Sequence, residues 1–171
     1  MNIESIFGNP LGKINGVYIS NKASSDFENQ QQTNEAFTNK WGAYSKEDIK
    51  KQEDFFDFQK KWYLTLYGFS SENELASYLK EKPIILDAGC GLGYKARWFA
   101  DLAPDSTVLG IDYSDAVAVA AKRYKNTRNL IWVKGDIADT GILPEIIDYI
   151  SCDQVIMHTE NPARTFKELV R

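Results

Sequence analysis

The chain has 171 residues, of which 43% are hydrophobic and 13% aromatic, and this is enough for one domain with a buried core. A net charge of −4, from 20 basic and 24 acidic side chains, gives no general attraction to nucleic acid or to anionic membranes. No apolar run approaches the roughly 20 residues that cross a bilayer, and residues 1–5 lack the features of a signal peptide, so we expect a cytoplasmic protein.

The two cysteines, Cys90 and Cys152, stand far apart in the sequence, one in a glycine-rich turn and one in an apolar run. This placement favours small buried residues over a disulfide or half of a zinc site. We therefore expect no metal site.

Residues 1–40 are rich in glycine, serine, glutamine and asparagine, a composition that cannot bury enough surface to fold alone. We expect this N-terminal segment to be loosely ordered. Residues 14–19 could form a hairpin against a neighbouring element, because an isolated hairpin is marginal in water.

Residues 41–82 predict a helical N-terminal extension rich in aromatic side chains. Apolar side chains recur there at three- and four-residue steps, which places them on one helix face: Phe55, Phe58, Trp62 and Leu66. Two interpretations remain open, a helix that packs this face on the core and a lid that closes over a ligand. Ser71 and Glu74 have the spacing of a capping box, which predicts a second helix through Leu79.

The stretch 83–93 predicts a buried strand that ends in a tight turn, since an apolar run is followed by glycines at every second position. Good helix formers follow over 94–103. Such a turn lets a ligand approach bare backbone at a helix N-terminus.

Three more strand-like runs alternate with helical segments after this turn. The predicted strands span 107–111, 130–133 and 149 to about 156, and the predicted helices 114–125 and 162–170. The last helix should turn three side chains inward: Phe166, Leu169 and Val170. Strands that alternate with helices indicate an α/β fold, a doubly wound, Rossmann-like parallel sheet with helices on both faces.

Two carboxylates follow these strands at the edge where the glycine turn lies. Asp112 ends the second strand, 19 positions after Gly93, where an acid can accept both hydroxyls of a ribose. Asp136 ends the third, where it can accept from an exocyclic amine. Tyr113 directly follows Asp112, and Ile137 directly follows Asp136. Both are placed to enclose a flat base. Together these residues describe an adenosine site, although either acid alone could be a turn residue.

A dinucleotide site is the competing interpretation of the glycine turn. It requires G-x-G-x-x-G, whereas here the third glycine, Gly93, comes one place early. A negative charge at Asp87 is poorly suited to a pyrophosphate and well suited to an ammonium or sulfonium group. The sequence therefore disfavours NAD.

The chain resembles the class I S-adenosylmethionine-dependent methyltransferases over residues 83–171. The motifs that carry the resemblance are Asp87-Ala88-Gly89-Cys90-Gly91-Leu92-Gly93, Asp112 and Gly135-Asp136-Ile137. The resemblance implies S-adenosyl-L-methionine as the cofactor, with its methionine part on Gly89, Cys90, Gly91 and Gly93. It further implies Asp87 near the amine, Asp112 on the ribose, and Asp136 with Ile137 on the adenine. Residues 37–44 and 61–63 are similar to segments that precede the core in a subgroup of these enzymes, which supports the lid interpretation.

His158 is the only histidine and is predicted to follow the fourth strand on the same rim. It could take a proton from an attacking nucleophile, or it could simply hydrogen-bond the rim. Asp153 and Gln154 are alternative contacts to substrate or cofactor.

By this resemblance the sheet should have seven strands, and the sequence contains only four that can be recognised. We expect either a truncated chain, that is a partial cofactor-binding domain over 83–171, or a sheet completed by another chain through the open edge of the fourth strand. The leading hypothesis is a methyltransferase that acts on an O, N or C nucleophile of a small molecule. The alternative is a non-catalytic binding module or partner subunit that associates through that edge.

Overall fold

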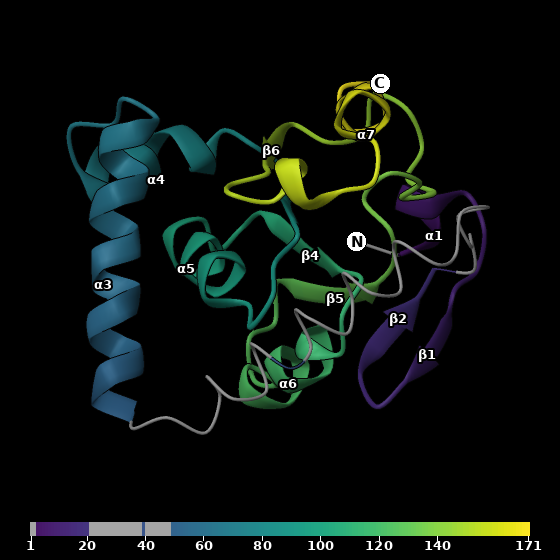
Figure 1. Cartoon of the computed structure of the whole chain (residues 1–171), viewed down its shortest axis with the longest axis horizontal. Coiled ribbons are helices and arrows are strands. Elements are labelled where there is room, and N and C mark those ends of the chain that lie inside the picture. The colour runs from purple at the N-terminus through teal and green to yellow at the C-terminus, as the bar shows by residue number, and fades with distance from the viewer. Residues whose placement is uncertain (1–2, 21–38, 40–48) are drawn as a thin grey trace.

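The computed structural model describes residues 3–20, 39 and 49–171 (Figure 1). In chain order its helices and strands are α1 (Glu4–Phe7), β1 (Gly12–Ile14), β2 (Val17–Ile19), α3 (Ile49–Leu66), α4 (Glu72–Lys80), β3 (Ile84–Ala88), α5 (Tyr94–Leu102), β4 (Thr107–Asp112), α6 (Ala116–Arg123), β5 (Leu130–Lys134), β6 (Tyr149–Ser151), the 3₁₀ helix η1 (Ile156–His158) and α7 (Pro162–Leu169). In this part of the chain no helix is long and apolar enough to cross a membrane.

Six strands of the described chain form one sheet in the order β1-β2-β5-β4-β3-β6. The pairs β2–β5, β5–β4, β4–β3 and β3–β6 are parallel, and only β1–β2 is antiparallel. The predicted α/β class and the four predicted strands are confirmed.

The fourth strand, β6, is shorter than predicted. It ends at Ser151 instead of continuing to about residue 156, and η1 occupies the end of the predicted range. The backbone of Gln154 has a φ of 60°, and a residue in this left-handed region interrupts an extended strand.

Residues 3–20 differ from the loosely ordered segment that their composition suggested. Asn15 and Gly16 both have positive φ, 49° and 88°, as a two-residue hairpin turn requires, and β1 and β2 form that hairpin. Strand β2 pairs with β5, so the hairpin is stabilised by extending the sheet. The rest of 1–40, except Asn39, lies outside the described residues.

Helices cover both faces of the sheet (Figure 1). One core cluster joins the sheet to α4, α5 and α6 and includes Ile85, Val108, Leu75, Phe99 and Val117. The other joins it to α1 and α7 and includes Leu86, Leu109, Ile111, Ile6 and Leu169. Successive residues of β3 thus serve opposite faces, as a strand buried on both sides requires.

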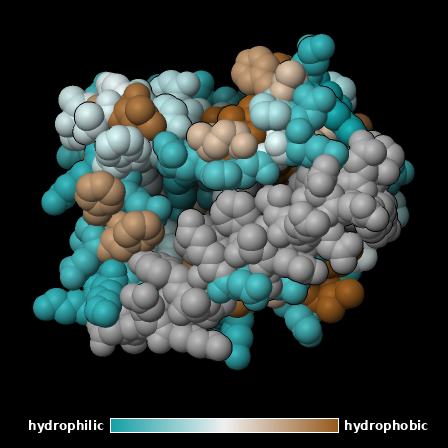
Figure 2. Space-filling model, in the orientation of Figure 1, coloured by the Kyte–Doolittle hydropathy of each residue, from teal (hydrophilic) through white to brown (hydrophobic). Residues whose placement is uncertain are grey.

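Helix α3 packs on the core through a different face from the predicted one. Tyr63 is 1% exposed and makes edge-to-face contacts with Trp98 and Phe99 of α5. The four side chains predicted to share a face are 39–61% exposed: Phe55, Phe58, Trp62 and Leu66. Hydrophobic residues are accordingly visible at the surface over α3 (Figure 2). Helical spacing identified a real stripe but not which side of the helix meets the core.

Helix α7 shows a similar difference. It begins with Pro162 and is capped by Asn161, whose side chain accepts from the Arg164 N–H. Leu169 points inward as predicted, but Phe166 and Val170 are 57% and 60% exposed. The inward side of this helix is instead completed by the buried Thr165.

Candidate functional site

The glycine turn joins β3 to α5 at the carboxyl edge of the sheet. The N–H groups of Gly89 and Cys90 both donate to the Ile111 carbonyl, at 2.8 and 3.0 Å, which fastens the turn to β4. Gly89, Gly91 and Gly93 all have positive φ, between 51° and 77°. The predicted tight turn is therefore present, and the N-cap of the helix that follows it is Gly93, which has no side chain to accept a hydrogen bond.

Packing inside the chain requires a glycine at the end of this turn. A Cβ atom on Gly93 would lie 2.3 Å from the Trp132 indole and 2.8 Å from the Ala120 Cβ. A Cβ on Gly89 would similarly meet Val155 at 2.4 Å. The glycines thus let α6, β5 and the segment after β6 approach the turn closely.

Asp87 is buried beneath the turn with one oxygen unused. It is 2% exposed, and no described residue hydrogen-bonds its Oδ2. Burial raises its pKa to about 6, and the Lys95 ammonium and a hydrogen bond from the Ala96 N–H offset only part of this rise. Such a carboxylate is an acceptor for a buried cationic donor.

Ser151 faces Asp87 from the neighbouring strand. The two residues are register partners on β6 and β3, and the Ser151 Oγ also lacks a hydrogen-bond partner among the described residues. Buried polar atoms are nearly always hydrogen-bonded, so two such atoms side by side mark a place where a ligand is expected.

A charged network lies beside this pair. The Lys95 Nζ is 2.8 Å from Asp153 Oδ2, and the Tyr67 hydroxyl donates to Asp153 Oδ1 at 3.1 Å. The Lys95 ammonium also lies 5.3 Å from the centre of the Tyr63 ring. Burial, followed by the nearby Asp153, raises the pKa of Tyr67. The network connects α3 and the residue after it to the loop that follows β6.

Asp153 was predicted here from the sequence, but Lys95, Tyr63 and Tyr67 were not. The two tyrosines stand four residues apart, Tyr63 in α3 and Tyr67 directly after it, and this spacing is typical of packing rather than of chemistry. Lys95 is the second residue of the helix after the turn, and that position is the only sequence feature that could have indicated it.

Asp112 is the last residue of β4, and the chain itself holds its carboxylate. Its Oδ2 accepts from the Gly91 N–H at 2.7 Å. Its Oδ1 accepts from the Ser114 N–H at 2.8 Å and the Ser114 hydroxyl at 2.6 Å. Oδ1 already accepts two hydrogen bonds and Oδ2 only one, so Asp112 orients the glycine turn and can still accept from a ligand through Oδ2.

Asp136 follows β5 and resembles Asp87 in its surroundings. It is 2% exposed, its Oδ1 accepts from the Ala138 N–H at 2.8 Å, and its Oδ2 has no partner among the described residues. Burial raises its pKa. Ile137 is buried in the core, and Tyr113 is half-buried. Their enclosure of a flat base stays a prediction.

His158 does not lie directly at the end of a strand. It is the exposed last residue of η1, seven positions after Ser151, because β6 ends early. Gln154 is also exposed. The roles predicted for both remain untested by this geometry. Cys90 and Cys152 are free thiols whose pKa values burial raises.

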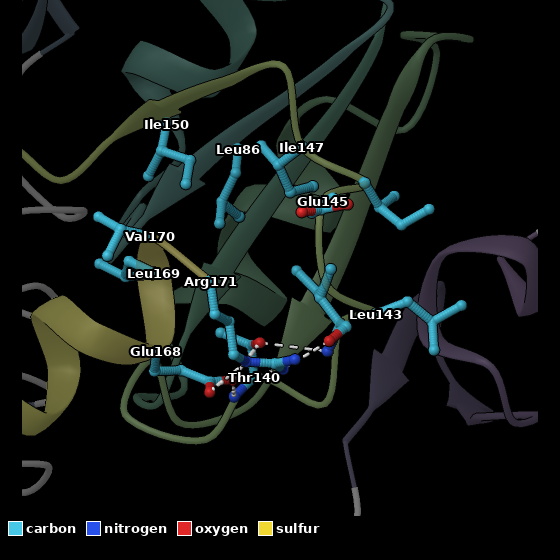
Figure 3. A pocket seen from close by; sticks show the side chains of 12 residues that line it. Leu86, Thr140, Leu143, Glu145, Ile147, Ile150, Glu168, Leu169, Val170 and Arg171 are labelled. Atoms are coloured by element: carbon cyan, nitrogen blue, oxygen red, sulfur yellow. Dashed lines mark hydrogen bonds and ion pairs between the residues drawn. The ribbon is translucent and has the colours of Figure 1, made fainter.

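A separate cavity of about 240 Å³ lies beneath α7 (Figure 3). Its walls include Leu86, Ile150 and Leu169. Two of its charged groups are engaged with the chain: Glu168 pairs with Arg171 at 2.6 Å and accepts from the Thr140 hydroxyl at 2.7 Å. None of the predicted site residues lines it, so it is distinct from the strand-edge site.

A family model described as a methyltransferase domain matches residues 86–171, half of the chain. The chain belongs to this methyltransferase family. The match begins at the strand before the glycine turn and confirms the resemblance to class I S-adenosylmethionine-dependent methyltransferases.

Curated relatives of the chain include methyltransferases. The sterol 24-C-methyltransferase of Clavispora lusitaniae is 25% identical over an alignment that covers 81% of this chain and 45% of that protein. The malonyl-[acyl-carrier protein] O-methyltransferase of Legionella pneumophila is 32% identical over 101 residues, 57% of this chain and 35% of that protein. The chain thus spans less than half the length of each of them.

Solved methyltransferase structures share the fold. The magnesium protoporphyrin IX methyltransferase of Synechocystis PCC 6803, solved with bound SAM, has a TM-score of 0.58 at 17% identity, covering 86% of this chain and 73% of that one. The plantazolicin methyltransferase BpumL, solved with SAH, has a TM-score of 0.51 at 24% identity, covering 82% of this chain and 56% of that one. At these identities the likeness supports the α/β fold.

Proposed function

We propose that this chain is an S-adenosylmethionine-dependent methyltransferase, or the cofactor-binding part of one. The observation that carries the proposal is a pair of buried oxygens at the carboxyl edge of the sheet, Asp87 Oδ2 and Asp136 Oδ2, that have no hydrogen-bond partner among the described residues. Asp87 lies near the end of β3 and Asp136 follows β5, with β4 and Asp112 between them. S-adenosylmethionine has an amine at each end and a ribose in the middle, which fits this order of acceptors.

The residues of the site suit this cofactor in charge as well as in order. When bound, the cofactor would supply a sulfonium methyl group, which a nucleophile attacks in line with the C–S bond while S-adenosylhomocysteine leaves with the bonding electrons. Asp87 and Asp153 place negative charge near the glycine turn, where a cationic ligand is favoured. Asp112 fixes the turn through the Gly91 N–H and so orients whatever rests on it. Methyl transfer depends chiefly on such alignment of donor and acceptor.

The acceptor in this proposal is an O, N or C nucleophile of a small molecule. The sterol methyltransferase relative, whose name identifies a small-molecule acceptor, aligns with 81% of the chain. The exposed His158 is our candidate for the base that removes a proton from the acceptor.

A second candidate function is a non-catalytic module that binds the cofactor and pairs with another chain. It is favoured by β6, which within the described chain pairs with β3 alone and ends the sheet. A monomer in sedimentation that transfers methyl groups would exclude this alternative.

Isothermal titration calorimetry with S-adenosylhomocysteine tests the proposal. We expect the wild type to bind and Asp112→Ala to bind at least about tenfold more weakly, because a charge-assisted acceptor is lost. Asp105→Ala is the matched control, an exposed aspartate before the opposite end of β4. Circular dichroism verifies that each variant is folded. Absence of binding by the wild type, or equal binding by wild type and Asp112→Ala, would refute the proposal.

A further inference from the structure

The Lys95 side chain lies close to two carboxylates near the glycine turn. Its ammonium pairs with Asp153 at 2.8 Å and is close enough to Asp87 to lower the pKa of that acid. The side chains of Lys95 and Asp153 are only 20% and 11% exposed. Side chains in a first helical turn point back toward the helix N-terminus, which directs Lys95 at the strand edge.

The charges of this cluster are complementary to those of an amino-acid sulfonium. Asp87, Asp153 and Lys95 sum to −1 when all are ionised, whereas a sulfonium-bearing amino acid carries an ammonium, a carboxylate and a sulfonium that sum to +1. The unpartnered, 2% exposed Asp87 Oδ2 provides an independent sign of a missing cationic partner. A ligand ammonium at Asp87 would leave the ligand carboxylate in need of a donor nearby.

We propose that Lys95 binds the carboxylate of the amino-acid part of the ligand while it keeps its ion pair with Asp153. This inference rests on the proposed function and adds a residue that determines which sulfur nucleosides bind. An ammonium has three N–H donors, so one can serve Asp153 and another the ligand carboxylate. The N-terminus of α5, where the Gly93 N-cap has no side chain and the Ala96 N–H donates to Asp87, further favours negative charge at this end of the helix.

A purely structural role predicts a different outcome from this assignment. If Lys95 only ties α5 to the loop after β6, its removal weakens every ligand of the site equally. If it binds the carboxylate, its removal weakens only ligands that carry one. The two roles can therefore be distinguished by measuring each variant with two ligands, one with the carboxylate and one without it.

The experiment measures two ligands by calorimetry on the whole chain. S-adenosylhomocysteine carries the amine and the carboxylate, and S-adenosyl-3-thiopropylamine keeps the amine but lacks the carboxylate. The variants are Lys95→Met, which removes the charge, and Lys95→Arg, which keeps it. Lys95→Gln is used instead of Lys95→Met if Lys95→Met does not fold. Lys80→Met, an exposed lysine at the end of α4, is the control.

We expect the wild type and Lys80→Met to prefer S-adenosylhomocysteine by about tenfold or more, the effect of one charge-assisted hydrogen bond. Lys95→Met should lose this preference and bind both ligands alike, and Lys95→Arg should retain most of it. Equal binding of both ligands by the wild type, or a preference that persists in Lys95→Met, would overturn the assignment. Failure of the wild type to bind either ligand would instead refute the proposed function.

Discussion

Asp87 and Ser151 lie opposite each other on the adjacent strands β3 and β6, and each presents a buried oxygen that no described residue hydrogen-bonds. An unsatisfied buried polar group costs about 1 to 3 kcal/mol, so the free chain is less stable than its packing alone would make it. A ligand that supplies donors here recovers this free energy. Stability and ligand binding should therefore respond in opposite directions to changes at this edge.

Replacing Asp87 by asparagine should stabilise the free chain at neutral pH. A rise in the Asp87 pKa from 3.8 to about 6 corresponds to about 3 kcal/mol of free energy. Asparagine removes the buried charge, so we expect the free energy of unfolding at pH 7 to increase by about 1 to 3 kcal/mol in urea denaturation. A less stable Asp87→Asn chain would show that Lys95 compensates the charge fully.

The same pKa gives the stability a definite dependence on pH. Because the folded-state pKa lies above the unfolded value, the stability contributed by neutral Asp87 is fully present below about pH 4 and is lost as pH rises through about 6. Lys95, Asp153 and Asp112 surround this group, and other acids titrate as well. The difference in unfolding free energy between wild type and Asp87→Asn isolates the contribution. A difference that does not change between pH 4 and 7 would contradict the buried-carboxylate interpretation.

Ligand affinity should show the reverse trend with pH. An ammonium pairs with the ionised form of Asp87, so binding of S-adenosylhomocysteine should weaken as pH falls below about 6. Asp87→Asn should bind weakly at every pH while remaining folded. Calorimetry at pH 5 and pH 7.5 measures both effects, and a pH-independent affinity in the wild type would argue against Asp87 as the amine acceptor.

A methyl group at Gly93 should destabilise the fold through a specific clash. Gly93 and Gly68 have the same φ of 77°, but an added Cβ would lie 2.3 Å from Trp132 at Gly93 and in open space at Gly68. Gly68→Ala is thus the matched control and should cost about 1 kcal/mol from backbone strain alone. Gly93→Ala should cost about 1 to 3 kcal/mol more. Equal losses in urea denaturation would mean that the Trp132 contact relaxes freely.

Two neighbouring aromatic residues of α3 should differ sharply in their contribution to stability. Tyr63 is buried and hydrogen-bonds the Tyr149 hydroxyl at 2.5 Å, so Tyr63→Ala should lower the unfolding free energy by about 3 to 5 kcal/mol. Trp62 is 49% exposed, and Trp62→Ala should change the unfolding free energy by less than about 1 kcal/mol. If Trp62→Ala lowered the unfolding free energy strongly and Tyr63→Ala only slightly, the face of α3 predicted from the sequence would be the one that packs on the core.

The sequence was informative where local pattern and topology act together. Strand, glycine turn and helix follow one another within residues 83–102, and parallel strands bring their carboxyl ends to one edge. Asp87, Asp112 and Asp136 could therefore be placed there without coordinates. The Asn15-Gly16 turn could also be recognised, but its partner strand could not, because β2 meets β5 more than a hundred residues later.

Long-range side-chain contacts could not be predicted. Lys95 meets Asp153 across 58 positions, and Tyr67 meets it across 86. Periodicity shows that a helix has an apolar face but not what lies opposite that face. The exposed Phe166 was therefore assigned an inward position, and the face that includes the exposed Phe58 was left open between core and lid. The early end of β6 depends on one left-handed residue, Gln154, in an otherwise strand-like run.

The location of the bound cofactor is the central claim, and a ¹H–¹⁵N chemical-shift titration with S-adenosylhomocysteine tests it most directly. We predict that the largest backbone shifts fall in residues 87–94, 112–113, 136–137 and 151–154, around the carboxyl ends of β3, β4, β5 and β6. The cavity beneath α7 provides the contrast, because its lining at Leu143, Glu145 and Val170 should shift little. Shifts confined to that cavity, or no shifts at saturating ligand, would contradict the account.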